Sequence, residues 1–275
     1  MILLTGANGV VGRAVARQLV DKGIPLTAVT RGENSLPNTV QGDLFNPSWL
    51  EPTLEGVEAI QISPRATGPG LGELLQLASK QGVRRAVLLS ATTVNHPAGE
   101  PRFAAEFKAA EDLVKDSGLD WTILRLADFA ANALAWAPQI KAGDVVRGAY
   151  ATATTSPIHE ADIAAVAVQA LADKAHAGST LTLTGPQPLD QSAKVRIIGS
   201  AIGRPLSFQE LPANQVRQAM LAQGLPEEVP ARLLGSLADY ATHPGPTTET
   251  VAALLGHPAL TFTDWARDNA PAFGA

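Results

Sequence analysis

The sequence predicts an α/β fold, in which a doubly wound parallel sheet is followed by a small, mostly helical C-terminal lobe. Short apolar runs of strand type alternate with helical segments through six units, up to residue 125. A glycine-rich turn joins the first strand to the first helix, and the chain beyond residue 189 consists of short helical segments separated by prolines. Regular alternation of strands and helices is typical of a parallel sheet with right-handed crossovers.

The composition argues against several functional classes. The chain has no cysteine, which excludes disulfides, thiolate catalysis and cysteine metal sites. The five histidines are scattered, so we expect no metal site. Lysine and arginine are dispersed and the net charge is −5, so we expect no nucleic acid as partner. Without a bilayer-long apolar run or a cationic leader, we expect a cytoplasmic protein with no membrane partner.

The glycine-rich turn carries the clearest functional signal. Three apolar residues, Ile2 to Leu4, lead into glycines at every third position, and Val10–Val20 has the apolar spacing of a helix. Glycines allow positive φ and close approach of a ligand, and a helix N-terminus offers unpaired N–H groups to an anion. The turn therefore predicts a dinucleotide pyrophosphate site, the alternative being a structural turn that binds nothing. The expected contacts are Thr5, Gly6, Asn8, Gly9, Val10, Val11 and Gly12.

The second predicted strand, Pro25–Thr30, ends at Arg31. In a dinucleotide-binding fold the tip of this strand, about 20 residues beyond the glycine turn, faces the adenosine ribose. An acidic residue there selects a free 2′-hydroxyl, whereas an arginine accommodates a 2′-phosphate. Arg31 therefore predicts NADP(H) as the cofactor. The alternative is a solvated loop arginine whose charge is offset by Glu33.

Two further strand ends supply candidate cofactor contacts. Residues 40–44 form a brief strand that ends with Asp43 and Leu44, and a helix is expected from Asn46. Asp43 could accept a hydrogen bond from the adenine amino group, or could cap the next turn. The strand at 58–63 ends at Ser63-Pro64, beside the expected path of the ribose and pyrophosphate.

The later segments complete the predicted sheet. Arg85–Ser90 is a near-continuous apolar run, as expected of a central strand covered on both faces. We expect helices at 68–82 and 101–117, a strand at 121–125, a hairpin or extended arm at 142–150, an amphipathic helix at 160–173 and a last strand at 180–184. The dinucleotide-binding core is expected at 1–127, completed by 156–185, and the smaller lobe at 128–155 and 186–275.

Several of these motifs together resemble the NmrA-like branch of the atypical short-chain dehydrogenases. They are the glycine turn, the Gly42-Asp43-Leu44 step, the stretch SGLDWTILR at 117–125, an F-x-x-N motif from Phe129 and an I-x-x-x-D-I-A motif from Ile158. The resemblance covers about residues 1–190. It implies an NADP(H)-binding Rossmann domain, with the nicotinamide directed into a cleft beside the C-terminal lobe. Members include quinone and enone reductases, relatives of phenylpropanoid reductases and proteins that sense the redox state of the cofactor.

Catalytic short-chain dehydrogenases generally carry a Y-x-x-x-K motif, and this chain departs from it. Its only tyrosines are Tyr150 and Tyr240, and neither stands four residues before Lys108. Lys108 lies one residue from the register of a family lysine, which makes it a candidate for catalysis and cofactor binding. Alternatively, it is a solvated helix lysine paired with Glu111 or Asp112.

The ends of the fifth and sixth strands supply the other candidates for chemistry. Ser90 corresponds in place to a serine that steadies the substrate carbonyl in relatives, and it is also a candidate cofactor contact. The family's L-R-P is altered to Leu124-Arg125-Leu126-Ala127-Asp128. Asp128 could bind or protonate a substrate, or cap the helix that follows. Asn132 and Trp136, one helical turn apart, could form a substrate wall or pack against the C-terminal lobe. Candidate substrate contacts are Phe129, Asn132, Trp136 and His159.

We therefore expect an NADPH-dependent oxidoreductase that reduces a small quinone, enone or carbonyl compound. Because no Y-x-x-x-K tyrosine is present, we expect acceptors whose reduction requires little general-acid catalysis. Quinones and enones are such acceptors, because their reduced oxyanions are stabilised by resonance. The alternatives are a non-catalytic NADP(H)-binding redox sensor, and a non-redox cyclase or isomerase on the same fold. The expected partner is a small-molecule substrate, and the sequence leaves an oligomer open.

Overall fold

The computed structural model describes residues 1–36 and 38–274. The chain divides into two compact units, each built from several segments. The first unit comprises Met1–Ala91, Ala105–Leu126 and Glu160–Leu183, and the second comprises Thr92–Ala104, Ala127–His159 and Thr184–Ala275. Within the described ranges, no helix is both long and apolar enough to cross a membrane.

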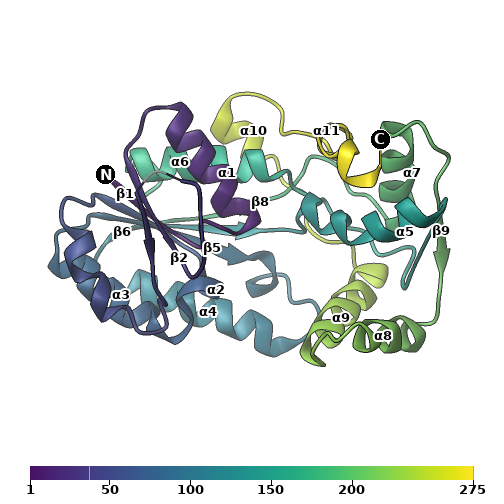
Figure 1. Cartoon of the computed structure of the whole chain (residues 1–275), viewed down its shortest axis with the longest axis horizontal. Helices are drawn as coiled ribbons and strands as arrows, with labels where there is room; N and C mark the ends of the chain where they lie inside the picture. Colours follow the sequence, from purple (N-terminus) through teal and green to yellow (C-terminus); the bar gives the residue numbers. More distant parts are fainter. Residues whose placement is uncertain (37, 275) are drawn as a thin grey trace. The chain divides into compact units, whose positions relative to one another are not determined.

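The first unit contains a seven-stranded sheet in which every strand pair is parallel (Figure 1). From edge to edge, the strands are β3 (Thr39–Gln41), β2 (Leu26–Thr30), β1 (Ile2–Thr5), β4 (Ala59–Ile62), β5 (Arg85–Ala91), β6 (Asp120–Leu126) and β8 (Ser179–Leu183). The strand order runs outward in both directions from β1, so the order reverses between β1 and β4. The predicted doubly wound parallel sheet is thereby confirmed, and its switch point lies at β1, where ligands bind in such sheets.

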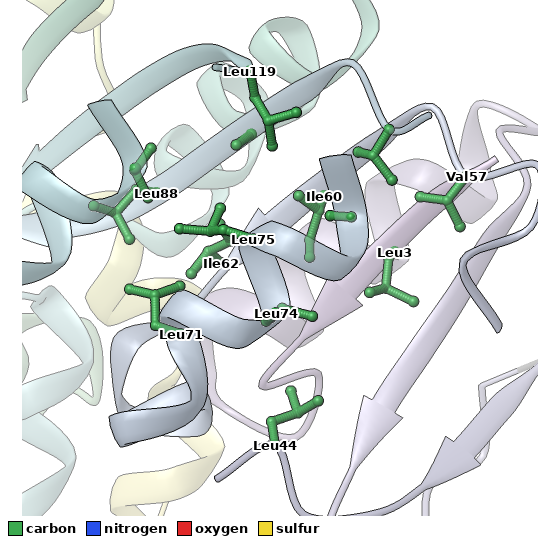
Figure 2. Close-up of a cluster of buried hydrophobic side chains, with 14 of the residues drawn as sticks. Leu3, Leu44, Val57, Ile60, Ile62, Leu71, Leu74, Leu75, Leu88 and Leu119 are labelled. Atoms are coloured by element: carbon green, nitrogen blue, oxygen red, sulfur yellow. The ribbon is translucent and has the colours of Figure 1, made fainter. Parts of the chain in front are cut away.

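Helices cover both faces of this sheet (Figure 1). On one face α1 (Val10–Asp21) packs beside α6 (Glu160–Ala172). On the other face lie α3 (Leu71–Lys80), α4 (Pro101–Lys115) and the 3₁₀ helix η1 (Pro47–Leu54). Figure 2 shows how leucines of α3 reach the sheet residues Ile60 and Ile62 of β4. The helix expected from Asn46 is a 3₁₀ helix because Pro52 lies inside it and has no N–H to donate.

The second unit has its own apolar core and a small sheet. Its elements are η3 (Thr92–Val94), η4 (Ala130–Trp136), α5 (Ala137–Ala142), β7 (Val145–Gly148), α7 (Gln191–Ala201), β9 (Ser207–Glu210), α8 (Ala213–Ala222), α9 (Glu228–Thr242), α10 (Thr250–Leu255), α11 (Phe262–Asp268) and η5 (Ala270–Phe273). The Trp265 ring stacks on Phe262 at 5.2 Å and meets Phe273 edge-on at 6.2 Å. These rings hold α11 and η5 against the core that α7 and β7 share.

Of the hairpin or extended arm predicted at 142–150, the hairpin was wrong, and the extended part is the strand β7. That stretch contains the end of α5 and then β7, which pairs in parallel with β9, sixty residues later in the chain. The strand β9 was not predicted at all. Four residues with one large apolar side chain, Phe208, give too short an alternation to reveal a strand.

The segment Thr92–Ala104 follows β5, and it belongs to the second unit because it contacts α9. The backbone N–H of Gly99 donates to Asp239 Oδ2 at 2.7 Å, and the Arg232 guanidinium lies over the Phe103 ring at 4.9 Å. In the sequence-based division, this segment was placed in the dinucleotide-binding core.

A buried ion pair links three elements of the first unit. Glu111 of α4 is fully buried and accepts two hydrogen bonds from the guanidinium of Arg125 in β6, at 2.8 and 2.7 Å. The hydroxyl of Ser90 in β5 donates to the same carboxylate at 2.6 Å, and Lys115 lies 3.6 Å away. Burial would raise the pKa of Glu111, but the bonds from Arg125 and Ser90 and the nearby positive charges hold that pKa below its ordinary value.

This network predicts an acid-sensitive contribution to stability. Because the pKa of Glu111 is lower in the folded than in the unfolded protein, its stabilisation is present above the unfolded value of 4.5 and is lost as the pH falls through the folded pKa. We expect Glu111→Gln to lower the free energy of unfolding by about 3–5 kcal/mol at neutral pH, because it leaves Arg125 without its counter-charge. The loss of stability between neutral and acid pH should also become smaller.

Urea unfolding of both proteins across this pH range measures the effect. The matched control is Asp112→Asn on the same helix, which removes only an exposed pair with Lys108 and should leave stability unchanged. Equal effects of the two substitutions would show that the buried pair does not stabilise the fold.

Candidate functional site

The turn between β1 and α1 has the geometry of an anion-binding loop. Gly6 has a φ of +66°, and its carbonyl accepts from the N–H of Gly9 at 2.9 Å. Gly9 is the N-cap of α1, with φ −73° and ψ 166°. The helical hydrogen bonds begin with the N–H of Arg13, which donates to the Gly9 carbonyl, so the N–H groups of Val10, Val11 and Gly12 precede them. The hydrogens of these three N–H groups and the positive end of the helix dipole point toward the turn.

The three glycines are required for different reasons. A Cβ on Gly12 would lie 2.2 Å from the Gly6 carbonyl oxygen, so Gly12 lets the helix pack against the turn. A Cβ on Gly6 would lie 3.0 Å from Cβ of Ser63, and its positive φ also favours glycine. Gly9 is exposed, its φ is ordinary, and its nearest obstacle is the Gly6 oxygen at 3.2 Å. The expected positive φ therefore occurs at Gly6 and not at Gly9, whose exposed Cα is the surface that a ligand can approach.

The ends of β1 and β4 are joined by a hydrogen bond. The buried hydroxyl of Thr5 accepts from the backbone N–H of Ser63 at 2.8 Å. Ser63 is the N-cap of the short helix α2 (Pro64–Thr67), in which Pro64 is the first residue. The side chain of Thr5 thus fixes the spacing of the two strand ends that border the glycine turn, and Ser63 and Pro64 lie beside that turn.

Asn8 connects the glycine turn to the loop that follows β2. Its amide nitrogen donates to the Glu33 carbonyl at 3.2 Å, and its amide oxygen accepts from Asn34 at 2.6 Å. Arg13 donates to the Asn8 carbonyl at 2.6 Å, which places a second guanidinium at the turn. Arg31 follows β2 directly and is exposed. The sequence analysis identified Arg31 but missed Arg13, whose position directly after Gly12 was the available signal.

Beyond the end of β3, Asp43 caps a turn, which is one of the two alternatives considered for it. Its Oδ1 accepts from the backbone N–H of Phe45 at 3.0 Å, which forms a side-chain turn. The side chain remains exposed, so contact with a ligand stays a prediction. Leu44 is buried in the core, so its contact with a cofactor also stays a prediction.

Ser90 and Lys108, two of the catalytic candidates, each bind a neighbouring carboxylate. Ser90 is only 3% exposed, and its hydroxyl donates to Glu111 in the buried network. Lys108 lies on the exposed face of α4, where its ammonium group lies 2.6 Å from both carboxylate oxygens of Asp112. This is the solvated-pair alternative for Lys108. Catalytic roles for the two residues stay predictions.

Asp128 lies at the centre of a polar cluster in the second unit. Its Oδ2 accepts from Lys194 at 2.9 Å and from Thr155 at 2.8 Å, and its Oδ1 accepts from Asn132 at 2.7 Å. The expectation that it caps the following helix was wrong, because the N-cap of η4 is Phe129 and no side chain caps it. Burial would raise the pKa of Asp128, but Lys194 and the hydrogen bonds hold that pKa below its usual value. An ionised carboxylate of this kind does not act as a proton donor near neutral pH.

The four candidate substrate contacts have separate surroundings within the second unit. Asn132 is exposed and bonded to Asp128, whereas Trp136 packs edge-on against Phe208 at 6.3 Å in the apolar core. They do not share a face, because η4 is a 3₁₀ helix with three residues per turn. His159 is buried, with Nε2 3.4 Å from Asp268, and Phe129 pairs with the strand-like Ile158.

The comparisons with known proteins agree with this geometry. The chain is 34% identical over 280 residues to the (4-alkanoyl-5-oxo-2,5-dihydrofuran-3-yl)methyl phosphate reductase of Streptomyces griseus, covering 99% of both proteins. It is 30% identical over 297 residues to the NAD(P)H azoreductase of Xenophilus azovorans, covering 100% of both. The fold matches the NADPH-dependent quinone oxidoreductase of Escherichia coli with a TM-score of 0.82, at 24% identity and 98% and 99% coverage.

A family model described as NAD(P)H-binding matches residues 6–174, a range that begins at the glycine turn and ends just beyond α6. This range spans more than half of the chain, including five of the seven strands of the parallel sheet. The chain therefore belongs to the NAD(P)H-binding family, in agreement with its resemblance to the NmrA-like short-chain dehydrogenases.

Proposed function

We propose that the protein is an NADPH-dependent reductase of a small conjugated acceptor, such as a quinone, an enone or a related carbonyl compound. The observation that carries the proposal is the exposed glycine turn, whose N–H groups precede the helical hydrogen bonds and whose flanks carry Arg13 and Arg31. Bound NADPH would supply the hydride. The relatives support the reaction class, because a furanone phosphate reductase and an azoreductase are similar along the entire chain.

The residues of the first unit fit the parts of this cofactor. The N–H groups of Val10, Val11 and Gly12 suit the pyrophosphate, which the exposed Gly9 allows to approach the backbone. Arg31 suits a 2′-phosphate, since a guanidinium binds phosphate through two parallel hydrogen bonds. Arg13, which directly follows Gly12, supplies a second guanidinium at the turn. The exposed carboxylate of Asp43 suits the adenine amino group. The backbone at Ser63 and Pro64 would border the ribose and pyrophosphate.

A conjugated acceptor suits the groups available for chemistry. The chain lacks Y-x-x-x-K, Ser90 donates to Glu111, and Lys108 is paired with Asp112. A saturated ketone develops a strongly basic alkoxide on reduction and needs a positioned proton donor, whereas the reduced forms of quinones and enones spread the charge by resonance. The name of the Streptomyces relative describes a 5-oxo-2,5-dihydrofuran, which is a conjugated unsaturated lactone.

The proposed function predicts a ranking of acceptors. We expect NADPH oxidation with 1,4-naphthoquinone and 2-cyclohexen-1-one, and much slower oxidation with cyclohexanone, because only the first two form resonance-stabilised oxyanions on hydride addition. Absorbance of NADPH measures the three rates under identical conditions. Equal rates with the plain ketone would contradict the proposed substrate class. Absence of turnover with every acceptor, together with different affinities for NADPH and NADP⁺, would favour a redox sensor instead.

Arg31 predicts a preference for NADP(H) over NAD(H). Its charge-assisted contact to a 2′-phosphate should contribute about 1.5–3 kcal/mol, which corresponds to roughly ten- to a hundredfold in affinity. We expect Arg31→Ala to weaken NADPH binding by this factor and to leave NADH binding unchanged, as measured by calorimetry. The control is Arg17→Ala, an exposed arginine further along α1. A preference that survives in Arg31→Ala, or is lost equally in Arg17→Ala, would show that Arg31 does not read the phosphate.

Gly9 predicts a separation of binding from folding. A valine there fills the surface that the pyrophosphate would contact, while the extended φ and ψ of this position accept a β-branched residue, whose Cβ would lie 3.2 Å from the Gly6 carbonyl oxygen. We expect Gly9→Val to lose measurable cofactor binding in a fluorescence titration and to keep its circular dichroism spectrum. Gly143→Val is the control, because Gly143 also has extended backbone and an open Cβ position. Retained binding in Gly9→Val would place the pyrophosphate elsewhere.

A further inference from the structure

Asn8 lies in the glycine turn, but its side chain contacts the loop that follows β2, within the same unit. Its amide nitrogen donates to the Glu33 carbonyl at 3.2 Å, and its amide oxygen accepts from Nδ2 of Asn34 at 2.6 Å. Both polar atoms of the amide are therefore engaged by this loop. The sequence analysis treated Asn8 only as a direct cofactor contact, whereas these bonds join two parts of the cofactor site to each other.

Asn34 extends this connection along the loop. While its Nδ2 donates to Asn8, its Oδ1 accepts from the backbone N–H of Leu36 at 2.8 Å. The carbonyl of Leu36 accepts in turn from the hydroxyl of Thr39, the first residue of β3, at 2.8 Å. A series of hydrogen bonds thus runs from the glycine turn, through the loop, to the edge strand of the sheet.

Arg31 lies between two fixed points of this loop. The buried hydroxyl of Thr30 donates to the carbonyl of Gly32 at 2.5 Å, a bond that spans Arg31. One residue further, the Glu33 carbonyl is held by Asn8. The side chain of Arg31 is exposed. Its backbone is therefore fixed on both sides, while its guanidinium remains accessible to a ligand.

Arg13 reaches Asn8 from the first turn of α1. Its Nη1 donates to the Asn8 carbonyl at 2.6 Å, and its side chain is otherwise exposed. Both arginines are thus connected to Asn8, Arg13 directly and Arg31 through the loop. A phosphate monoester is close to doubly charged at neutral pH, so two guanidinium groups suit it better than one.

We propose that Asn8 is a positioning residue for the 2′-phosphate of NADP(H), because it holds the loop after β2 against the glycine turn so that Arg31, together with Arg13, meets that phosphate. The proposal rests on the cofactor preference proposed above and does not depend on which acceptor is reduced. Without the Asn8 side chain the loop has to be ordered when NADPH binds, and this ordering costs affinity. NADH has no 2′-phosphate, so its affinity depends much less on the loop.

The ratio of the affinities for NADPH and NADH tests this role. We expect Asn8→Ala to lower the ratio about tenfold, because it weakens the charge-assisted contact of Arg31. Calorimetric titration of both cofactors measures the ratio, and circular dichroism checks the fold. An unchanged ratio, or an equal loss for both cofactors, would overturn the proposal. A wild-type protein that binds both cofactors equally would contradict the preference for NADP(H) itself.

Two further variants show whether Asn8 acts through the loop. Asn34→Ala leaves the glycine turn intact and removes the partner of the Asn8 amide oxygen, so it should lower the ratio as well. The double variant Asn8→Ala/Arg31→Ala should have nearly the ratio of Arg31→Ala alone, whereas additive effects would show that Asn8 acts independently of Arg31. The control is Asn214→Ala in the second unit, whose side chain bonds only to the next N–H, and which should match the wild type.

Hydrogen exchange of the free protein measures the loop without any cofactor. We expect the backbone amides of residues 31–36 to exchange faster in Asn8→Ala than in the wild type, because the loop loses its bonds to the glycine turn. The exchange of α1 should not change. Faster exchange together with a lower affinity ratio would support the positioning role. Unchanged exchange would overturn it even if the ratio falls, since Asn8 would then contact the phosphate itself.

Discussion

The close approach of α1 to the carbonyl of Gly6 is the contact on which the cofactor half of the molecule depends. The space between them is so small that a Cβ on Gly12 would overlap the carbonyl oxygen at 2.2 Å. This approach sets the direction of α1, and with it the direction of the N–H groups of its first turn. The turn also lies against the end of β4, where the N–H of Ser63 donates to the Thr5 hydroxyl and a Cβ on Gly6 would lie 3.0 Å from Cβ of Ser63. A fixed donor array of this kind binds an anion without a cost of ordering at the moment of binding.

Much of the first unit could be predicted because its signals are local and long. The strands β1, β2 and β4 are buried along their whole length and β5 along its centre, so each reads as a short, mostly apolar run. The glycine turn follows from spacing alone. The errors occur where the signal is short or ambiguous: η1 contains a proline within an otherwise helical pattern, and β7 and β9 have four residues each. The pairing of β7 with β9 depends on contacts across sixty residues, which periodicity does not report.

The polar partners could not be predicted, because each is distant in the sequence. Ser90, Glu111 and Arg125 come from three elements, and only the folded sheet shows that a glutamate on a polar-looking helix is fully buried. The sequence analysis considered Glu111 only as a partner for Lys108, because helical spacing was the available rule. In the structure two neighbouring carboxylates of α4 divide these roles: Glu111 bonds to β5 and β6, and Asp112 pairs with Lys108. The same limit hid Lys194, which lies sixty-six residues from Asp128.

The altered motif at Asp128 shows how a departure from a family pattern is compensated within the fold. An aspartate placed alone at this partly buried position would be costly, because an unpaired charge there loses part of its hydration. Lys194 is also almost fully buried, and it would be equally costly without a partner. The two charges are therefore tolerated only together, with Thr155 and Asn132 satisfying the remaining oxygen sites. Since this pairing keeps Asp128 ionised, the carboxylate is unsuited to deliver a proton.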